Sequence, residues 1–157
     1  MSKEIERKFL VKGRPWLNYE GMKVQQGYIA KSHSTVRIRI SSGKAWLTIK
    51  GKTKGISRTE FEYKIPVQDA NDMLDEFCGI QRIIKTRYVI PHKDYNWEVD
   101  VFEGQNTGLV IAEVELESED AKPELPDWIS DEVTFDTRYY NSRLLENPWP
   151  FKHLVDS

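Results

Sequence analysis

The sequence predicts a mainly β fold, in which an antiparallel sheet either packs on itself as a sandwich or closes into a barrel. Three observations favour this fold class. Eight segments alternate apolar and polar residues with the period of two that is typical of strands. Loops such as 41–44 and 103–108 have the Gly, Ser and Asn content of hairpin connections. Only two segments carry helical spacing.

The expected strands are rich in β-branched and aromatic residues, which favour a pleated, half-buried surface. They cover residues 4–11, 23–30, 35–41, 44–51, 58–65, 83–90, 96–103 and 109–117. A first helix is expected over 66–79, where Gly79 provides a C-cap. A second is expected over 136–147, because apolar residues recur there at helical spacing and Pro148 follows.

Length and composition indicate one domain, 1–157, without internal repeats. The net charge of −2 hides 23 basic and 25 acidic side chains, so no overall field attracts nucleic acid. Cys78 is the sole cysteine, which excludes an intramolecular disulfide and favours a reducing compartment. The N-terminus is too charged for a secretory signal, and no apolar run reaches membrane-spanning length. We therefore expect a cytoplasmic protein without a membrane partner.

The alternation places many charged residues on one face of the expected sheet, because alternate residues of a strand point to opposite sides. The opposite positions are mostly apolar, as in Ile5, Phe9, Ile38 and Val99. The charged positions, strand by strand, are Glu4, Glu6 and Lys8; Arg37 and Arg39; Lys50 and Lys52; Arg58, Glu60, Glu62 and Lys64; Lys85 and Arg87; Glu98 and Asp100; and Glu113, Glu115 and Glu117.

Two interpretations of this face compete. An antiparallel sheet with one solvated face would also look charged, and for any single strand this is the simpler interpretation. Across all strands it weakens, because like charges recur one pleat apart, whereas a surface selected for solubility intersperses the signs. If the sheet closes with the charged face inward, so many buried charges require partners. Arg and Lys clusters suit phosphates, and clustered carboxylates suit a hard cation such as Mg²⁺ or Mn²⁺.

The ordered motifs resemble those of the CYTH superfamily, the triphosphate tunnel metalloenzymes. The resemblance begins with Glu4-x-Glu6-x-Lys8, which is similar to the family's ExExK motif. It continues in order through RIRI (37–40), LTIKGK (47–52), RTEFEYKI (58–65), KTRY (85–88), WEVDVF (97–102), AEVELE (112–117) and YYNSRLL (139–145). The resemblance implies a closed eight-stranded antiparallel β-barrel, with a charged lumen and a few helices packed outside.

The resemblance also implies roles for the charged positions. Phosphate contacts are implied for Lys8, Arg37, Arg39, Lys50, Lys52, Arg58, Lys85 and Arg87. Metal binding is implied for Glu4, Glu6, Glu60, Glu62, Asp100, Glu115 and Glu117. The implied cofactor is Mg²⁺ or Mn²⁺, the implied partner is a small triphosphate, and family members commonly form homodimers.

Hydrolysis of a triphosphate needs an anchored chain, neutralised charge and an activated water. No histidine falls on the charged face, so the base is a carboxylate, a metal-bound hydroxide or a lysine. Lys85 is one pleat from Arg87, and crowding by cations lowers the pKa of a lysine toward that of a base. The resemblance supports Lys85 as the base, with Lys8 as the second catalytic candidate, although a plain phosphate contact by Lys85 stays open.

The expected substrate is inorganic tripolyphosphate, which compact family members of this type hydrolyse to pyrophosphate and phosphate. The alternatives are a class IV adenylate cyclase, a nucleoside or thiamine triphosphatase, and a barrel that binds polyphosphate or nucleotide without catalysis. GKT at 51–53 is not a P-loop, because Trp46 stands where that motif requires Gly and a strand follows it.

Overall fold

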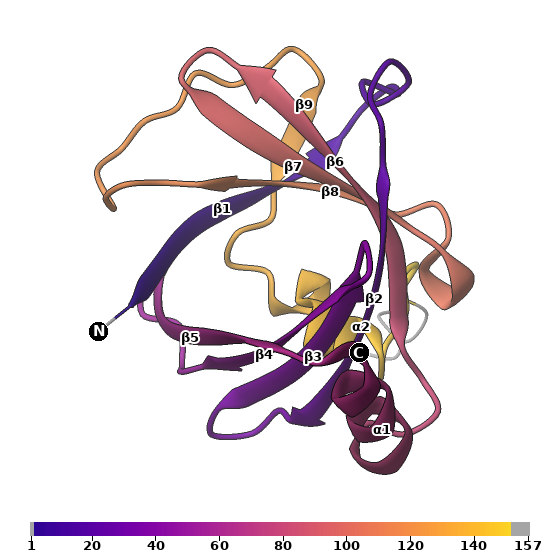
Figure 1. Cartoon of the computed structure of the whole chain (residues 1–157). Helices are drawn as coiled ribbons and strands as arrows, with labels where there is room; N and C mark the ends of the chain where they lie inside the picture. The colour runs from indigo at the N-terminus through magenta and orange to yellow at the C-terminus, as the bar shows by residue number, and fades with distance from the viewer. Residues whose placement is uncertain (1, 152–157) are drawn as a thin grey trace.

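The computed structural model describes residues 2–151, which form one closed antiparallel barrel (Figure 1). The strands are β1 (Lys3–Val11), β2 (Met22–Ala30), β3 (Thr35–Ser41), β4 (Lys44–Lys50), β5 (Ser57–Ile65), β6 (Ile83–His92), β7 (Tyr95–Phe102), β8 (Val110–Glu115) and β9 (Ile129–Glu132). The helical elements are α1 (Val67–Phe77), α2 (Asn141–Leu144) and the 3₁₀ turns η1 (Gly104–Asn106) and η2 (Thr137–Tyr139). The eight predicted strands are confirmed.

The barrel closes where the first strand meets the fifth. The order around the sheet is β5-β4-β3-β2-β6-β7-β8-β1, and Glu4 of β1 pairs with Arg58 of β5 to complete the circle. The sequence left open whether the sheet formed a sandwich or a barrel, and the β1–β5 pairing confirms the barrel. The short strand β9 was not predicted; it pairs with β1 beyond the closed circle, with Ile129 opposite Val11.

Apolar residues on the outer faces of the strands need cover, and α1 provides part of it. Ala70 and Leu74 of α1 are fully buried against Ile38 and Ala45 of the sheet. Gly27 of β2 lets the helix approach closely, because a Cβ there would lie 2.8 Å from the Cβ of Cys78. The predicted first helix is confirmed, and it packs outside the barrel as expected.

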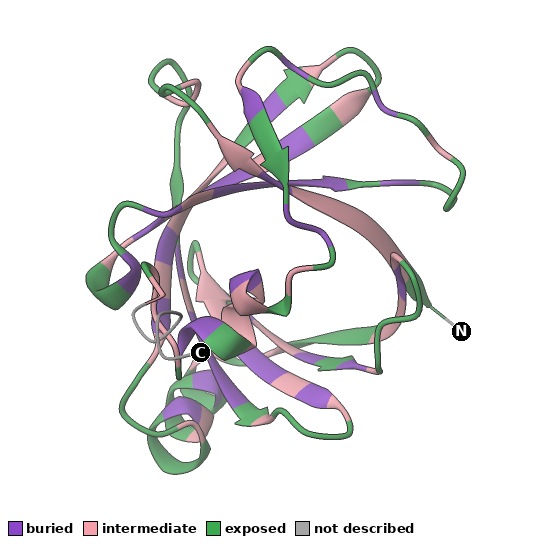
Figure 2. Ribbon diagram, turned by 180° about the vertical axis from the view of Figure 1, so that it is seen from behind, coloured by how far each residue is buried: buried purple, intermediate pink, exposed green. Residues whose placement is uncertain are grey.

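The second predicted helix is wrong in length and in place. Residues 136–147 form η2 and the single turn α2, and they lie across one mouth of the barrel (Figures 1 and 2). The inward side chains near this mouth are apolar. Ile83, Phe102 and Ile111 each lie two residues from a charged residue on the same face of the strand, namely Lys85, Asp100 and Glu113. These three residues form a core cluster with Tyr139, Leu144 and Leu145 of the C-terminal segment.

This apolar cluster decides which side of the segment faces the lumen. The backbone is extended at Tyr140, between η2 and α2, and the apolar side chains on either side of it cover this end of the barrel. The charged lumen is therefore a cup with one covered end. Among residues 2–151, no helix is long and apolar enough to cross a membrane.

Candidate active site

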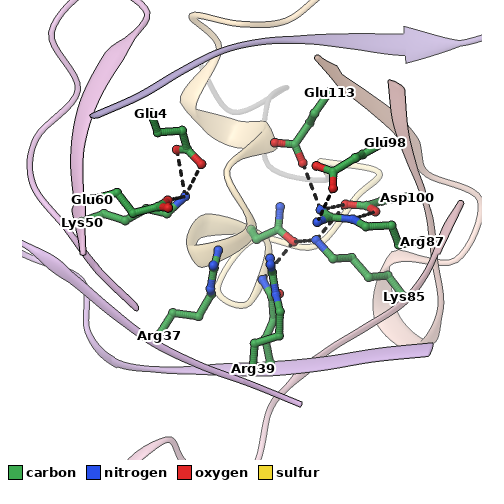
Figure 3. A network of polar contacts seen from close by, with 12 residues as sticks. Glu4, Arg37, Arg39, Lys50, Glu60, Lys85, Arg87, Glu98, Asp100 and Glu113 are labelled. Atoms are coloured by element: carbon green, nitrogen blue, oxygen red, sulfur yellow. Dashed lines mark hydrogen bonds and ion pairs between the residues drawn. The ribbon is translucent and has the colours of Figure 1, made fainter. Parts of the chain in front are cut away.

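A cavity of about 240 Å³ occupies the lumen, and charged side chains from seven of the eight barrel strands surround it, while β2 contributes Tyr28 (Figure 3). The structure brings most of the predicted site residues to its surface: Glu4, Glu6, Lys8, Arg37, Arg39, Lys50, Arg58, Glu60, Glu62, Lys85, Arg87 and Glu115. Three predicted residues lie elsewhere. Lys52 is exposed after β4, Glu117 lies beyond the end of β8 and accepts a hydrogen bond from Tyr95, and Asp100 is buried in the barrel wall.

Glu4, Lys50 and Glu60 form one ionic group of the cavity wall. The Nζ of Lys50 lies 3.0 Å from Glu4 Oε1 and 3.3 Å from Glu60 Oε2. Burial alone would raise the pKa of Glu4, but the charge of Lys50 and hydrogen bonds with Glu60 and Lys50 lower it below its ordinary value. Burial and the charge of Glu4 raise the pKa of Glu60. The two carboxylates thus share one ammonium group, that of Lys50.

Glu6 and Glu113 form a second carboxylate pair across the β1–β8 ladder. Burial and the neighbouring charge of Glu113 raise the pKa of Glu6 well above its ordinary value. The pKa of Glu113 is lowered, because Lys8 and Arg87 together outweigh the effect of burial. Glu6 therefore loses its proton less readily than an ordinary carboxyl group, and a further cation beside the pair would favour its ionised form.

The two lysine candidates differ in their charge state. Burial would lower the pKa of Lys8, but Glu113 and Glu6 outweigh it, so the pKa of Lys8 is raised and the side chain stays an ammonium over the ring of Tyr140 at 4.9 Å. Lys85 is only 1% exposed. Burial, with repulsion from Arg87 and Arg39, lowers the pKa of Lys85 to about 7 against the attraction of Asp100. Lys85 therefore suits a base, and Lys8 suits a phosphate contact.

Asp100 joins Lys85 to Arg87 in the barrel wall. Lys85 Nζ lies 2.8 Å from Asp100 Oδ2, and Arg87 donates to Oδ1 and Oδ2 at 2.7 and 2.9 Å (Figure 3). Burial would raise the pKa of Asp100, but the two cations lower it. Both carboxylate oxygens are thus occupied by cations of the protein. We therefore leave Asp100, with Glu117, out of the metal site that we propose below.

Three arginines, Arg37 and Arg39 of β3 and Arg58 of β5, line the cavity beside these groups. Arg37 donates to Thr48 at 3.3 Å, and within residues 2–151 its buried Nε has no acceptor. Burial and the charges of Arg37 and Arg87 lower the pKa of Arg39 to about 10. Arg58 donates through Nη2 to Thr35. Because crowded cations with unpaired donors cost free energy, this wall suits a multivalent anion.

Several residues of the lumen were not predicted as site residues. Glu113 shares the alternation of Glu115, so its pattern was visible, although the resemblance pointed to its neighbour. Gln26 and Asn141 carry no charge, and no periodicity marked them; they contact Arg39 and Lys85 inside the barrel. Only the fold brings Asn141 there, because it comes from the C-terminal segment.

The carboxylates of the lumen offer the hard oxygen ligands that Mg²⁺ and Mn²⁺ prefer. Within residues 2–151, no group of three His, Cys, Asp or Glu side chains stands ready as a preformed metal site. The raised pKa values of Glu6 and Glu60 show carboxylates that a divalent cation would relieve of mutual repulsion. Since Mg²⁺ commonly takes one or two carboxylates together with substrate phosphates, the donor set fits it.

A closed barrel whose lumen combines basic and acidic side chains offers ligands both to an anion and to a hard cation. The CYTH domain model matches residues 2–144, so the chain belongs to the CYTH domain family. This confirms the resemblance carried by the sequence motifs.

Two relatives extend the comparison over nearly the whole chain. An inorganic triphosphatase of Acetivibrio thermocellus is 48% identical over 151 residues, which cover 95% of this chain and 97% of the relative. An inorganic triphosphatase of Nitrosomonas europaea is 36% identical over 146 residues, with 90% and 95% covered.

Solved structures agree on the fold. The crystal structure of an inorganic triphosphatase is 35% identical, covers 90% of this chain and 97% of its own, and superposes with a TM-score of 0.65. A putative adenylate cyclase of Bacillus halodurans superposes with a TM-score of 0.60 at 19% identity, over 76% of this chain and 84% of its own. The latter likeness shows the fold alone.

Proposed function

We propose that this protein hydrolyses inorganic tripolyphosphate to pyrophosphate and phosphate with the help of a divalent metal ion. The arginine cluster supports the proposal most directly. Arg37, Arg39 and Arg58 line the enclosed cavity, the buried Nε of Arg37 has no acceptor within residues 2–151, and Glu62 at 3.6 Å from Arg37 is the one carboxylate within 4.0 Å of the three guanidinium groups in that range. Relatives at 48% and 36% identity are inorganic triphosphatases. A triphosphate satisfies the wall along its whole length, since each phosphoryl group carries oxygen acceptors.

The lining of the cavity favours an inorganic triphosphate over a nucleotide. Among the described residues that line it, the aromatic side chains are Tyr28 and Tyr140. The ring of Tyr28 is 8% exposed and packs in the apolar cluster at the covered mouth, and the ring of Tyr140 lies against the Lys8 ammonium. Neither ring is left as a platform on which a purine would stack, whereas stacking on aromatic side chains is the usual way to hold a base.

The metal ion would be Mg²⁺ or Mn²⁺, held by carboxylates of the lumen and by substrate oxygens. The carboxylates that we propose for it are Glu4, Glu6, Glu60, Glu62, Glu113 and Glu115. When bound, such an ion neutralises charge on the phosphoryl oxygens.

The protein's own side chains perform the remaining steps. Lys8, Lys50 and the three arginines bind the phosphoryl oxygens and hold the chain straight for in-line attack. The amine of Lys85, neutral in part at pH 7, accepts a proton from water as the water oxygen attacks the terminal phosphorus. The bond from that phosphorus to the bridging oxygen breaks, and pyrophosphate leaves with the bridging oxygen and its electron pair.

Phosphate release tests the proposal directly. The purified protein is incubated with tripolyphosphate, ATP or thiamine triphosphate, each with Mg²⁺, Mn²⁺ or EDTA, and phosphate, pyrophosphate and cyclic AMP are measured. We expect equimolar phosphate and pyrophosphate from tripolyphosphate, with ATP and thiamine triphosphate turned over far more slowly. Cyclic AMP from ATP, or tripolyphosphate binding without turnover, would overturn the proposal.

A further inference from the structure

Asn141 reaches from the C-terminal segment into the lumen and contacts the proposed base. Its Oδ1 accepts a hydrogen bond from Lys85 Nζ at 2.8 Å and a second from Gln26 Nε2 at 3.2 Å. Gln26 is fully buried on β2, so its amide lies in the barrel wall. The covered mouth of the barrel thus contributes a polar group to the site.

Arg39 fixes the orientation of both amides. A guanidinium only donates, so the Gln26 atom that faces Arg39 Nε at 2.9 Å is Oε1. The Nε2 of Gln26 must then point away from Arg39, and it donates to Asn141 Oδ1 and to the hydroxyl of Tyr28 at 2.9 Å. Flipping either amide would set donor against donor. The oxygen of Asn141 therefore faces Lys85 for a chemical reason.

Two acceptors then hold the amino group of Lys85. Asn141 Oδ1 and Asp100 Oδ2 each lie 2.8 Å from Nζ and take two of its tetrahedral directions. The neutral amine has two N–H bonds, and it donates one to each of these two acceptors. The bond to Cε takes a third tetrahedral direction, so the lone pair occupies the fourth. The centroid of the Phe102 ring lies 5.5 Å from Nζ.

We propose that Asn141, held by Gln26, is a positioning residue that aims the lone pair of Lys85 at the water that attacks the triphosphate. This role rests on the proposed function and deepens it, because it assigns the C-terminal segment a part in catalysis. Without Asn141, the amino group of Lys85 has only Asp100 as an acceptor and can rotate about that contact. Its lone pair then points at the attacking water in only some of its orientations.

The backbone of the C-terminal segment does not depend on the Asn141 side chain. Tyr139, Leu144 and Leu145 anchor the segment in the apolar core cluster, and Trp149 packs against the same cluster. The Asn141 side chain can therefore be truncated with the segment still seated. A loss of activity on truncation would report the contact with Lys85.

The test is a double-mutant cycle on tripolyphosphate hydrolysis. Asn141→Ala and Gln26→Met are made in the wild type, and Asn141→Ala is also made with Lys85→Ala. We expect Asn141→Ala to lower kcat about 10- to 100-fold, as misplacement of a catalytic group by about 1 Å does, with KM changed less than about twofold. Gln26→Met should lower kcat in the same direction. Arg143→Ala, an exposed change on the same helix α2, is the matched control and should leave kcat unchanged.

The cycle separates positioning from structural support. In the Lys85→Ala background, Asn141→Ala should cause no further loss, because the group it orients is gone. An equal loss in both backgrounds, or a rise in KM alone, would overturn the positioning role. A crystal structure of Asn141→Ala gives a second readout, in which Nζ should leave its place; an unmoved Nζ would also overturn the role.

The activities of the wild type and of Asn141→Ala distinguish a failure of the proposed function from a failure of the positioning role. A wild type that releases no phosphate from tripolyphosphate would overturn the proposed function and the positioning role together. An active wild type whose kcat is insensitive to Asn141→Ala would overturn the positioning role alone.

Discussion

Asp100 holds Arg87 with two hydrogen bonds, from Nε at 2.7 Å and from Nη2 at 2.9 Å, while one of the same oxygens lies 2.8 Å from Lys85 Nζ. Both Asp100 and Lys85 are 1% exposed. Cations buried this deeply are stable only because the carboxylate compensates them. Asp100 therefore stabilises the barrel wall, and its charge raises the pKa of Lys85 against the effect of burial.

Replacing Asp100 by Ala should destabilise the barrel strongly. Breaking a buried ion pair from one side leaves uncompensated charge, and this costs about 3–5 kcal/mol of unfolding free energy. The measurement is chemical denaturation of the wild type and the variant at pH 7.5, read as the change in unfolding free energy.

An exposed ion pair provides the control for this change. Lys23 and Glu103 lie 2.6 Å apart with side chains 62% and 39% exposed. Lys23→Ala should cost no more than about 1 kcal/mol, as exposed pairs do. Equal effects of Asp100→Ala and Lys23→Ala would contradict the assignment of Asp100 as a buried counter-ion.

The activity should rise with pH through about 7. The pKa of Lys85 is lowered to about 7 by burial and by Arg87 and Arg39, with Asp100 and Glu113 acting against them. A base works in its deprotonated form, so raising the pH through this pKa increases the active fraction, and lowering it removes the base. The measurement is kcat against pH from 5.5 to 9 at saturating tripolyphosphate and metal.

A change at Asp100 that removes the charge but keeps the shape of the side chain tests the origin of this profile. Asp100→Asn removes the group that favours the ammonium form, so the pKa of Lys85 should fall further and the acid limb should move to lower pH. If the acid limb of the kcat–pH profile does not move in Asp100→Asn, or if it persists in Lys85→Ala, the titrating group is not Lys85.

The strands and most of the lumen could be predicted from the sequence, because a pleated strand separates its two faces residue by residue. Arg7 illustrates this: it lies between Glu6 and Lys8 in the motif but on the other face, where it pairs with Glu132 outside the barrel at 2.8 Å. The same alternation placed Glu4 and Glu6 correctly in the lumen.

The alternation failed where local pattern does not decide position. Glu117 continues the spacing of Glu113 and Glu115, but β8 ends at Glu115, so the spacing no longer defines a face. Lys52 fails for the same reason after β4. Asn141 could not be predicted from the sequence, because its position in the lumen depends on how the C-terminal segment covers the mouth of the barrel. That packing is a long-range contact, and the alternation of residues along a strand carries no information about it.

Changing Arg37 should weaken substrate binding more than turnover. Its buried Nε has no acceptor within residues 2–151, so a phosphate oxygen would complete its hydrogen bonding. Arg37→Lys keeps the charge but loses the planar set of donors, and the loss of one charge-assisted hydrogen bond of about 1.5–3 kcal/mol corresponds to a rise in KM of about 10- to 100-fold. Lys44→Gln, at the exposed start of β4, is the control. An unchanged KM in Arg37→Lys would remove Arg37 from the phosphate wall.

Glu6→Gln should raise the metal requirement of the enzyme. Burial and Glu113 raise the pKa of Glu6, and a divalent cation between the two carboxylates would favour the ionised form of both. The amide offers a weaker oxygen ligand and no charge, so the Mg²⁺ concentration for half-maximal activity should rise about 10-fold or more, corresponding to about 1.4 kcal/mol. The measurement is activity against Mg²⁺ concentration, with Glu117→Gln, outside the cavity, as the matched control. If Glu117→Gln shifts the Mg²⁺ dependence and Glu6→Gln does not, the metal lies outside the lumen.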